Sequence, residues 1–408
     1  MEDSKSAKDR IKLSKFKLDS LLDITLSINA NLPTEELLAK YESILRNSLG
    51  IGKILIFKHS DKWACILNAG FPENYETIIN SASSLLNITE ITFEPPSPEF
   101  ELIDIIIPVF NNNVPLAYVL IGDIEEEGEG MSPVLKHLNF IQTISSIIVV
   151  AIENIRLFNE SLAQESMKKE LELAAKMQNM LIPDKSKMPH KAPLIVTGFY
   201  YPHYEIGGDY YDCIKLSDTK TGFCIADVSG KGISAAMLMS NFQASLRALF
   251  THNIDLELLV RKLNGIVAVN AAGEKFITFF VARYDNQKRV LEYINAAHTP
   301  PVLFNTVTGE IKHLKSSCVG LGMLDEMPYV KLQEIYIAQR SKIVCYTDGL
   351  SELKDDVGVD IGTNTIIKHI SNLLPIEDNI LSLISELGIP DSNPYLFDDV
   401  SIIAADIS

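Results

Sequence analysis

The sequence predicts an α+β protein of two domains joined by a helix. Its 408 residues exceed the usual size of one domain. The first part alternates helices with short strands, whereas the part beyond Leu194 shows repeated strands interrupted by a helix pair. This pattern indicates a small α/β domain, a linking helix and a C-terminal sandwich of two packed sheets flanked by helices.

The expected N-terminal domain covers residues 16–158. Residues 1–15 are polar and lysine-rich, which predicts a flexible N-terminus. Apolar residues at helical spacing predict helices over 16–30 and over 34–49, with Thr34 as the cap of the second. Strands are expected over 53–57, 63–67, 102–109 and 116–121, with a hairpin turn at Asn111-Asn112-Asn113. A further long helix is expected over 132–158.

This order of elements resembles a GAF domain, a small α/β sensor module. The resemblance implies a regulatory small-molecule or protein signal, whose identity the sequence does not show. An α+β packing domain without a ligand remains the alternative.

Residues 159–183 are predicted to form a linking helix that transmits the state of the sensor. Leu171, Ala174, Gln178 and Leu181 share one face of this helix. Asn159 and Ser166 fall where a coiled-coil seam needs apolar residues. We therefore expect a connecting helix that pairs with its copy in a homodimer, and Pro183 ends it.

The expected C-terminal domain covers residues 184–408. Helices are predicted over 234–251, with Ser234 near the cap, and over 256–271. The predicted strands are 195–201, 210–215, 222–227, 276–284, 290–295, 301–305, 342–347 and 400–405.

Composition excludes several classes of function. A net charge of -17 argues against nucleic-acid binding and against adhesion to anionic lipid. The five cysteines form no CxxC pair, and Cys224 and Cys345 sit in apolar strands as expected core residues. The N-terminus lacks a signal-peptide pattern, and the apolar stretch 140–152 is too short to cross a bilayer. A cytoplasmic protein is expected, with no membrane partner.

Four acidic clusters stand beside glycines or strand ends in the last half of the chain. They are Gly207-Gly208-Asp209, Asp227-Val228-Ser229-Gly230-Lys231-Gly232, Tyr346-Thr347-Asp348-Gly349 and Phe397-Asp398-Asp399-Val400-Ser401. A carboxylate at the end of an apolar strand is costly to bury unless something neutralises it. Oxygen ligands without nearby histidine or cysteine favour magnesium or manganese over zinc. The clusters therefore predict a shared site for two divalent cations, which would need no protein nucleophile.

Other interpretations of these clusters are weaker. Each aspartate alone could be a turn former, since aspartate beside glycine is common in turns. A P-loop fails because Ile225 and Gly232 occupy positions that require glycine and serine or threonine. Gly207-Gly208-Asp209 is similar to the start of the diguanylate cyclase signature, but Tyr210 and Tyr211 replace its Glu-Phe. No cysteine is followed by five residues and then arginine, which excludes the cysteine-type phosphatases.

Six motifs in order resemble the SpoIIE/RsbU branch of the metal-dependent (type 2C) protein serine/threonine phosphatases, over about residues 170–408. They are the four acidic clusters, Asn295-Ala296-Ala297-His298-Thr299-Pro300-Pro301 and Gly320-Leu321-Gly322, and the lead-in helix 175–183 precedes them. The resemblance implies an α-β-β-α sandwich that hydrolyses phosphoserine or phosphothreonine by a metal-activated water, with two Mn²⁺ or Mg²⁺ ions. The implied substrate is a phosphorylated anti-sigma-factor antagonist or a similar bacterial signal-transduction regulator.

The same resemblance implies a role for each acidic residue. Asp227 would bridge both metals, and the Val228 carbonyl would be a further ligand. Asp209, Asp348 and Asp398 would complete the metal site, and Asp209, Asp227 and Asp348 would be the catalytic residues. Asp399 is the ambiguous neighbour, either a ligand or a residue that bonds to one.

Two departures from the family pattern are small. Ala297 stands where the family usually has glycine, and Ile182 stands where leucine is common. Asp212 is expected to be structural. His298 is expected to be structural as well, and protonation of the leaving group is the alternative role for it. The alternatives to the enzyme are a non-catalytic phosphatase-like scaffold and, with little support, a diguanylate cyclase.

Overall fold

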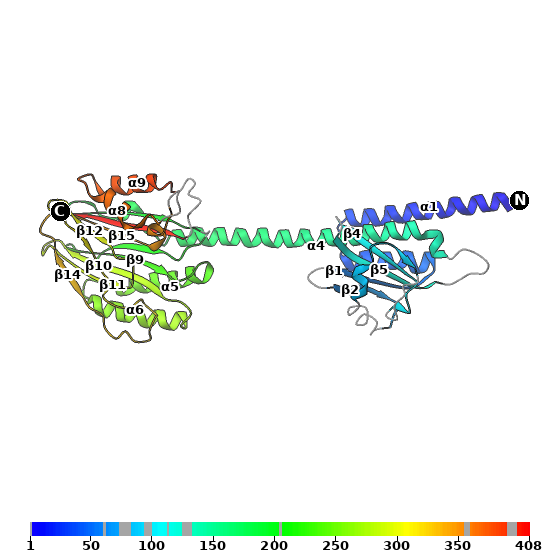
Figure 1. The fold of residues 1–408 in the computed structure, drawn as a ribbon, viewed down its shortest axis with the longest axis horizontal. Helices are drawn as coiled ribbons and strands as arrows, with labels where there is room; N and C mark the ends of the chain where they lie inside the picture. The colour runs from blue at the N-terminus through cyan, green and yellow to red at the C-terminus, as the bar shows by residue number, and fades with distance from the viewer. Residues whose placement is uncertain are drawn as a thin grey trace. The chain divides into compact units, whose positions relative to one another are not determined.

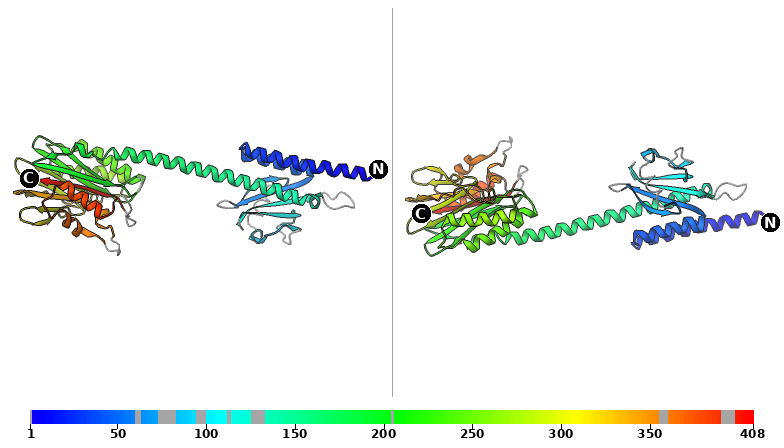
Figure 2. Two further views of the ribbon diagram at one scale, coloured as in Figure 1. Left: turned by 90° about the horizontal axis from the view of Figure 1, so that it is seen from above. Right: turned by 90° about the horizontal axis from the view of Figure 1, so that it is seen from below.

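The computed structural model in Figure 1 describes residues 2–59, 63–72, 83–93, 100–111, 114–124, 133–203, 206–354, 360–389 and 398–408. These residues form two compact units, Met1–Glu165 and Ser166–Ser408. Helix α4 (Pro133–Asn179) contributes its first part to one unit and its last part to the other, and Figure 2 shows it without a break from both directions. Two residues of the expected hairpin turn, Asn112 and Asn113, lie outside the described residues, as do Tyr204 and Phe397.

The first unit is a five-stranded sheet with helices. Its strand order is β2-β1-β5-β4-β3, and all neighbouring strands are antiparallel. Its elements are α1 (Glu2–Asn29), α2 (Thr34–Ser43), the π-helical η1 (Ile44–Ser48), β1 (Ile51–His59), β2 (Trp63–Ala69), the 3-10 helix η2 (Ser83–Asn87), β3 (Thr92–Phe93), β4 (Ile105–Asn111) and β5 (Val114–Ile124).

Two details of this unit differ from the expectations. The helical backbone of α1 starts at Glu2 and includes the residues expected to form a flexible terminus. Thr34 does not cap α2, because Pro33 occupies the cap position and Thr34 is the first helical residue. A proline just before a helix has a fixed backbone angle and no N–H to satisfy, so it favours this start.

Alternation along the strands divides the core of the first unit between the two faces of the sheet. Ile54 and Ile56 of β1 face the helices, whereas Leu55 and Phe57 pack on the opposite face. Helix α4 has a window with the length and hydropathy of a membrane span, but 44% of that window is buried inside the protein. Ile141 of α4 packs with Ile54 and Ile56 of β1, and so do the apolar residues that follow Ile141 at helical spacing along α4.

A polar contact also holds α4 against the sheet of the first unit. Lys58 of β1 and Glu153 of α4 are both buried, and Lys58 Nζ lies 2.6 Å from Glu153 Oε2. Hydrogen bonds from Arg156, together with Lys58, lower the pKa of Glu153 to about 2 despite its burial. The carboxylate is therefore charged and paired, as a buried ion must be.

The second unit is a four-layer sandwich. One sheet has the order β14-β11-β10-β9-β8 and the other has the order β13-β12-β15-β16-β7-β6. Its elements after α4 are η4 (Lys185–Lys187), β6 (His190–Lys191), β7 (Leu194–Tyr201), β8 (Tyr210–Lys215), β9 (Lys220–Val228), α5 (Ile233–Leu249), α6 (Leu256–Ala271), β10 (Ile277–Asp285), β11 (Val290–Ala296), β12 (Val302–Asn305), β13 (Ile311–His313), β14 (Gln333–Tyr336), β15 (Ser341–Tyr346), α7 (Asp348–Ser351), α8 (Gly362–Ile370), α9 (Ile376–Glu386) and β16 (Val400–Ile407).

Three apolar clusters hold these layers together. Phe223, Phe280 and Ile403 belong to the cluster between the two sheets. Helices α5 and α6 cover the outer face of the first sheet, where Phe242 of α5 meets the Phe279 ring edge-on with centroids 5.1 Å apart. Helices α8 and α9 cover the outer face of the second sheet.

The sequence did not predict every element of this unit. Helices α8 and α9 were missed, although their buried isoleucines recur at four-residue spacing. The short strands β6, β13 and β14 were missed as well. Ser234 does not cap α5, because Gly232 takes the cap position with a φ of 80°. Cys224 and Cys345 are fully buried, which confirms them as core residues.

Ala297, just after β11, adopts a backbone conformation that favours glycine. Its φ is 53°, in the left-handed region. Its N–H lies 3.1 Å from the Cys318 carbonyl oxygen and 3.1 Å from Ser316 Oγ, which hold the turn in place. The alanine that departs from the family pattern therefore carries backbone strain.

We predict that Ala297→Gly raises the free energy of unfolding by about 0.5–1 kcal/mol, because relief of left-handed strain exceeds the entropic cost of glycine. The matched control is Ala244→Gly on the exposed side of α5, which should lower stability by about 1 kcal/mol. Thermal unfolding of the three proteins measures both effects. A loss of stability in both variants would contradict the assignment of strain to Ala297.

Candidate metal centre

The five candidate acidic residues lie at adjoining ends of the two sheets of the second unit. Asp209 immediately precedes β8, and Asp227 is the penultimate residue of β9. From the other sheet, Asp348 follows β15 by two residues, and Asp398 with Asp399 leads into β16. The layered fold thus brings together residues that are up to 190 positions apart, as the Gly208–Asp399 hydrogen bond at |i−j| of 191 shows.

Asp209 is the most deeply buried member of the acidic cluster, with 2% of its surface exposed. Thr347 Oγ1 donates a hydrogen bond of 2.8 Å to Asp209 Oδ2, which joins the two sheets. Burial raises the pKa of Asp209 well above its usual range, and the charges of Asp227 and Asp399 raise it further. The hydrogen bond from Thr347 lowers the pKa of Asp209, but this effect is smaller than the increase caused by burial and the neighbouring charges.

Asp227 is half-buried at the centre of the cluster. Burial raises the pKa of Asp227 to about 7, with further contributions from the charges of Asp348, Asp398 and Asp399 and a small opposing effect of a hydrogen bond with Asp209. Burial and the Asp398 charge also raise the pKa of Asp348. Asp227 therefore interacts electrostatically with every other member of the cluster.

The two consecutive aspartates Asp398 and Asp399 have different surroundings. Both carboxylate oxygens of Asp399 accept backbone hydrogen bonds, 2.8 Å from His203 N and 2.6 Å from Gly208 N. The side chain of Asp398 is 45% exposed, and its Oδ2 lies 3.1 Å from Lys231 Nζ. Asp399 thus holds the loops around the site, whereas Asp398 lies nearer the surface and its Oδ1 accepts a hydrogen bond of 2.9 Å from the adjacent Asp399 N.

Two glycines let the backbone approach these carboxylates closely. A Cβ at Gly207 would overlap the Asp399 carboxylate and the Tyr200 hydroxyl, and a Cβ at Gly349 would overlap the Asp399 carbonyl oxygen. At Gly208 a Cβ would stand 3.1 Å from the Val228 carbonyl oxygen. The association of glycine with the acidic clusters therefore has a steric cause.

The donor chemistry of the cluster fits a hard divalent cation. The candidate ligands are carboxylate oxygens and one carbonyl oxygen, and their mutual repulsion is what a bound cation would relieve. Within the described part of the chain, however, no three acidic, histidine or cysteine side chains converge tightly enough to form a ligand shell. The structure thus brings the five aspartates within electrostatic reach without arranging them as ligands.

Two residues expected to be structural have structural surroundings. His298 is 3% exposed, its Nδ1 lies 2.8 Å from Thr278 Oγ1, and burial lowers its pKa to about 4. Asp212 is fully buried and accepts bonds from Arg247 Nε and from Tyr210 Oη. These contacts connect β8 to α5 behind the acidic cluster.

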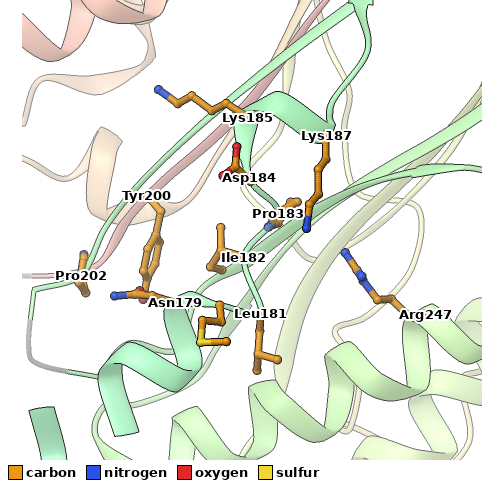
Figure 3. Close-up of a pocket in the computed structure, with 11 residues that line it drawn as sticks. Asn179, Leu181, Ile182, Pro183, Asp184, Lys185, Lys187, Tyr200, Pro202 and Arg247 are labelled. Carbon is orange, nitrogen blue, oxygen red and sulfur yellow. The ribbon is translucent and has the colours of Figure 1, made fainter. Parts of the chain in front are cut away.

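A cavity of about 880 Å³ lies beside the Gly207 loop (Figure 3). The turn from Asn179 to Asp184 lines it, together with Lys185, Lys187, Tyr200, Pro202 and Arg247. Figure 3 shows the Lys187 and Arg247 side chains extending toward each other, whereas Lys185 extends away. Lys187 and Arg247 therefore place positive charge on this wall, and the charge of Arg247 is already paired with the carboxylate of Asp212.

Sequence reasoning did not identify two residues that organise the site. Thr347 is fully buried, and besides bonding Asp209 its Oγ1 accepts a bond from Ser401 N. Gln178, expected only to share a helix face, bonds to the backbone of Gly207. Thr347 stands next to Asp348 in its motif, which was an available signal, whereas the partner of Gln178 is 29 residues away.

The raised pKa of Asp227 predicts a pH-dependent stability of the metal-free protein. The Asp227 carboxyl, with a pKa of about 7 in the folded state and an ordinary pKa of 3.8, holds its proton more tightly in the folded state. Stability therefore falls as pH rises from about 4 to about 7 and changes little above that range. Thermal unfolding in a chelator measures this fall.

Asp227→Asn should remove this contribution and stabilise the metal-free protein above neutral pH, by at most about 4 kcal/mol since one pKa unit corresponds to 1.36 kcal/mol. Asp325→Asn, at an exposed position, is the control that should leave the pH profile unchanged. If the Asp227→Asn protein were less stable than wild type at alkaline pH in chelator, this would contradict the inference that the charge of Asp227 is repelled by its neighbours.

Comparison with known proteins shows that the second unit is similar to a family. The family model "Stage II sporulation protein E (SpoIIE)" matches residues 217–408. The phosphoserine phosphatase RsbU of Bacillus subtilis is 29% identical over 195 residues, covering 48% of this chain and 57% of RsbU. The phosphoserine phosphatase RsbP of the same organism is 23% identical over 194 residues, covering 45% of this chain and 46% of RsbP. The chain spans about half the length of these curated relatives.

A solved structure agrees with the fold of the second unit. The SiaA-PP2C domain of Pseudomonas aeruginosa superposes with a TM-score of 0.51 at 18% identity, over 60% of this chain and 99% of that domain. At this identity the similarity concerns the fold alone. The family match and the two relatives agree that the C-terminal part of this chain is similar to the SpoIIE/RsbU-like branch of the type 2C phosphatases, and the solved structure shows the same fold.

Proposed function

We propose that the chain is a metal-dependent protein phosphatase that hydrolyses phosphoserine or phosphothreonine in a protein substrate. The buried acidic cluster around Asp227, within a SpoIIE-family domain, is the observation that carries the proposal. Both relatives described above are named phosphoserine phosphatases. The proposed substrate is a phosphorylated anti-sigma-factor antagonist or a similar regulator, by likeness to RsbU.

Two Mn²⁺ or Mg²⁺ ions, when bound, would neutralise the carboxylates, lower the pKa of a water and polarise the phosphoryl group. Asp227 would hold both ions, with the Val228 carbonyl, Asp209, Asp348 and Asp398 completing the site. Thr347 fixes the orientation of Asp209, and Asp399 fixes the Gly208 loop. Lys231, 3.1 Å from Asp398, would attract the phosphate to the cluster.

The surroundings of the two consecutive aspartates favour Asp398 as the ligand. Asp399 is 7% exposed and both of its oxygens accept backbone hydrogen bonds from distant segments. The side chain of Asp398 is 45% exposed, and its Oδ1 accepts a hydrogen bond from the adjacent Asp399 N, so its carboxylate is the more accessible of the two. Asp399 would then act on the metal only through the loops that it holds. The same reasoning makes Asp399 important for stability.

We also propose that residues 16–158 are a GAF-like sensor of a small-molecule or protein signal and that the chain is a cytoplasmic homodimer. The sensor proposal is supported by the five-stranded sheet of the first unit. The dimer is supported by exposed apolar residues on α4, including Leu157, Phe158 and Leu162. Sedimentation equilibrium should give twice the chain mass, and Leu162→Lys should favour the monomer. A wild-type monomer would contradict the dimer.

The phosphatase proposal predicts phosphate release from a phosphoserine protein that depends on Mn²⁺ and stops with chelator. Asp227→Asn and Asp348→Asn should lower kcat by at least about 100-fold, because each removes charge that holds the metal. Asp325→Asn should be unaffected, since this residue is exposed and distant in sequence from the clusters. Steady-state kinetics with candidate phosphoproteins measures these effects.

The same assay separates the two consecutive aspartates. Asp398→Asn should raise the Mn²⁺ concentration needed for half-maximal activity with little change in melting temperature. Asp399→Asn should lower the melting temperature, because an amide cannot accept both backbone hydrogen bonds. A wild-type protein that binds Mn²⁺ but releases no phosphate would favour the non-catalytic scaffold.

A further inference from the structure

Gln178 is a buried polar residue in an exposed part of its helix. It lies in the last turn of α4 and is 6% exposed, whereas Met177 and Met180 beside it are 65% and 82% exposed. Glutamine is mostly exposed in proteins, and a buried amide without partners is costly. The structural role of Gln178 therefore depends on the groups to which its side-chain amide is hydrogen-bonded.

The side-chain amide of Gln178 forms a reciprocal pair with the backbone of Gly207. Its Nε2 donates to the Gly207 carbonyl oxygen at 2.6 Å, and its Oε1 accepts from Gly207 N at 3.2 Å. Both backbone groups of this buried glycine are thus satisfied by one side chain. Removal of the amide would leave Gly207 N–H and C=O without these partners.

The paired glycine belongs to the segment that carries Asp209. Gly207 bonds to Gln178, Gly208 N donates to Asp399 Oδ2 at 2.6 Å, and Asp209 Oδ2 accepts from Thr347 Oγ1 at 2.8 Å. Three consecutive residues are therefore held by three different parts of the domain. Gln178 supplies the contact at the start of this segment, and it is the contact that comes from α4.

We infer that Gln178 is a positioning residue that sets the place of Asp209 in the acidic cluster and, through it, the affinity of the site for a divalent cation. Among the described residues, both hydrogen bonds of the Gln178 side chain are to the Gly207 backbone, and neither involves a carboxylate of the cluster. The end of α4 thereby controls how well the cluster is formed. The effect on catalysis rests on the proposed phosphatase function, whereas the effect on the loop and on metal binding does not.

Three variants of the full-length protein test this inference. Gln178→Met keeps the length of the side chain and removes both hydrogen bonds. Gln178→Glu has the same shape and keeps an acceptor for Gly207 N. Gln164→Met, at an exposed position of the same helix, is the matched control.

Amide hydrogen exchange over residues 206–210 reports the loop directly, and calorimetry with Mn²⁺ reports the site. In Gln178→Met we expect about five- to ten-fold faster exchange and a similar loss of Mn²⁺ affinity, as removal of a buried hydrogen bond implies. Gln178→Glu should recover part of the protection. The kcat at saturating Mn²⁺ should fall less than the affinity, because the ligands themselves remain.

Each outcome decides a different point. Exchange and Mn²⁺ affinity in Gln178→Met equal to those of Gln164→Met would overturn the inference and leave the phosphatase proposal standing. Faster exchange with weaker Mn²⁺ binding would support it even if no phosphoprotein were hydrolysed, a result that would overturn the proposed function alone. If Gln178→Met does not fold, the comparison of Gln178→Glu with Gln164→Met decides in the same way.

Discussion

Repulsion among buried carboxylates is the constraint on which the second unit depends. Asp209 and Asp399 are largely removed from water, whereas Asp227 is half-buried and Asp398 is more exposed. The charges of Asp398 and Asp399 both raise the pKa of Asp227. Backbone N–H groups of His203 and Gly208 compensate Asp399, and the Thr347 hydroxyl compensates Asp209. Among the described residues Asp227 has no comparable set of donors, so its charge is the one that a cation would have to balance.

The two-sheet architecture explains how such a cluster can exist. Asp209 and Asp227 come from one sheet, and Asp348, Asp398 and Asp399 come from the other. The apolar packing of Phe223, Phe280 and Ile403 between the sheets holds the two groups of charges together against their repulsion. Because the apolar packing of the whole core offsets the free-energy cost of this repulsion, neutralising a single aspartate is expected to relax the site without unfolding the domain.

The parts predicted from sequence are those encoded locally. Alternating apolar residues predicted β9, β15 and β16, and the aspartates at their ends followed from the same pattern. The sequence analysis did not predict helices α8 and α9, although Ile366 and Ile370 of α8 have helical spacing. The repeated strands of this unit favoured a strand-rich interpretation there. The partner of Gln178 could not be predicted, since no local rule relates a helix residue to a glycine 29 positions later. The choice between Asp398 and Asp399 also depends on contacts from distant segments.

Helix α4 is fixed by a polar contact near each end of a long exposed stretch. Glu153 pairs with Lys58 in the first unit, and Gln178 pairs with Gly207 in the second. From Leu157 to Glu170 every residue of the helix is exposed. An isolated helix of this length is only marginally stable in water. The stability of this stretch therefore depends on the groups that cover the exposed side chains of Leu157 and Leu162. A second copy of the chain on this face, as proposed above, would stabilise the helical turn that contains Gln178 and would thereby couple dimerisation to formation of the acidic site.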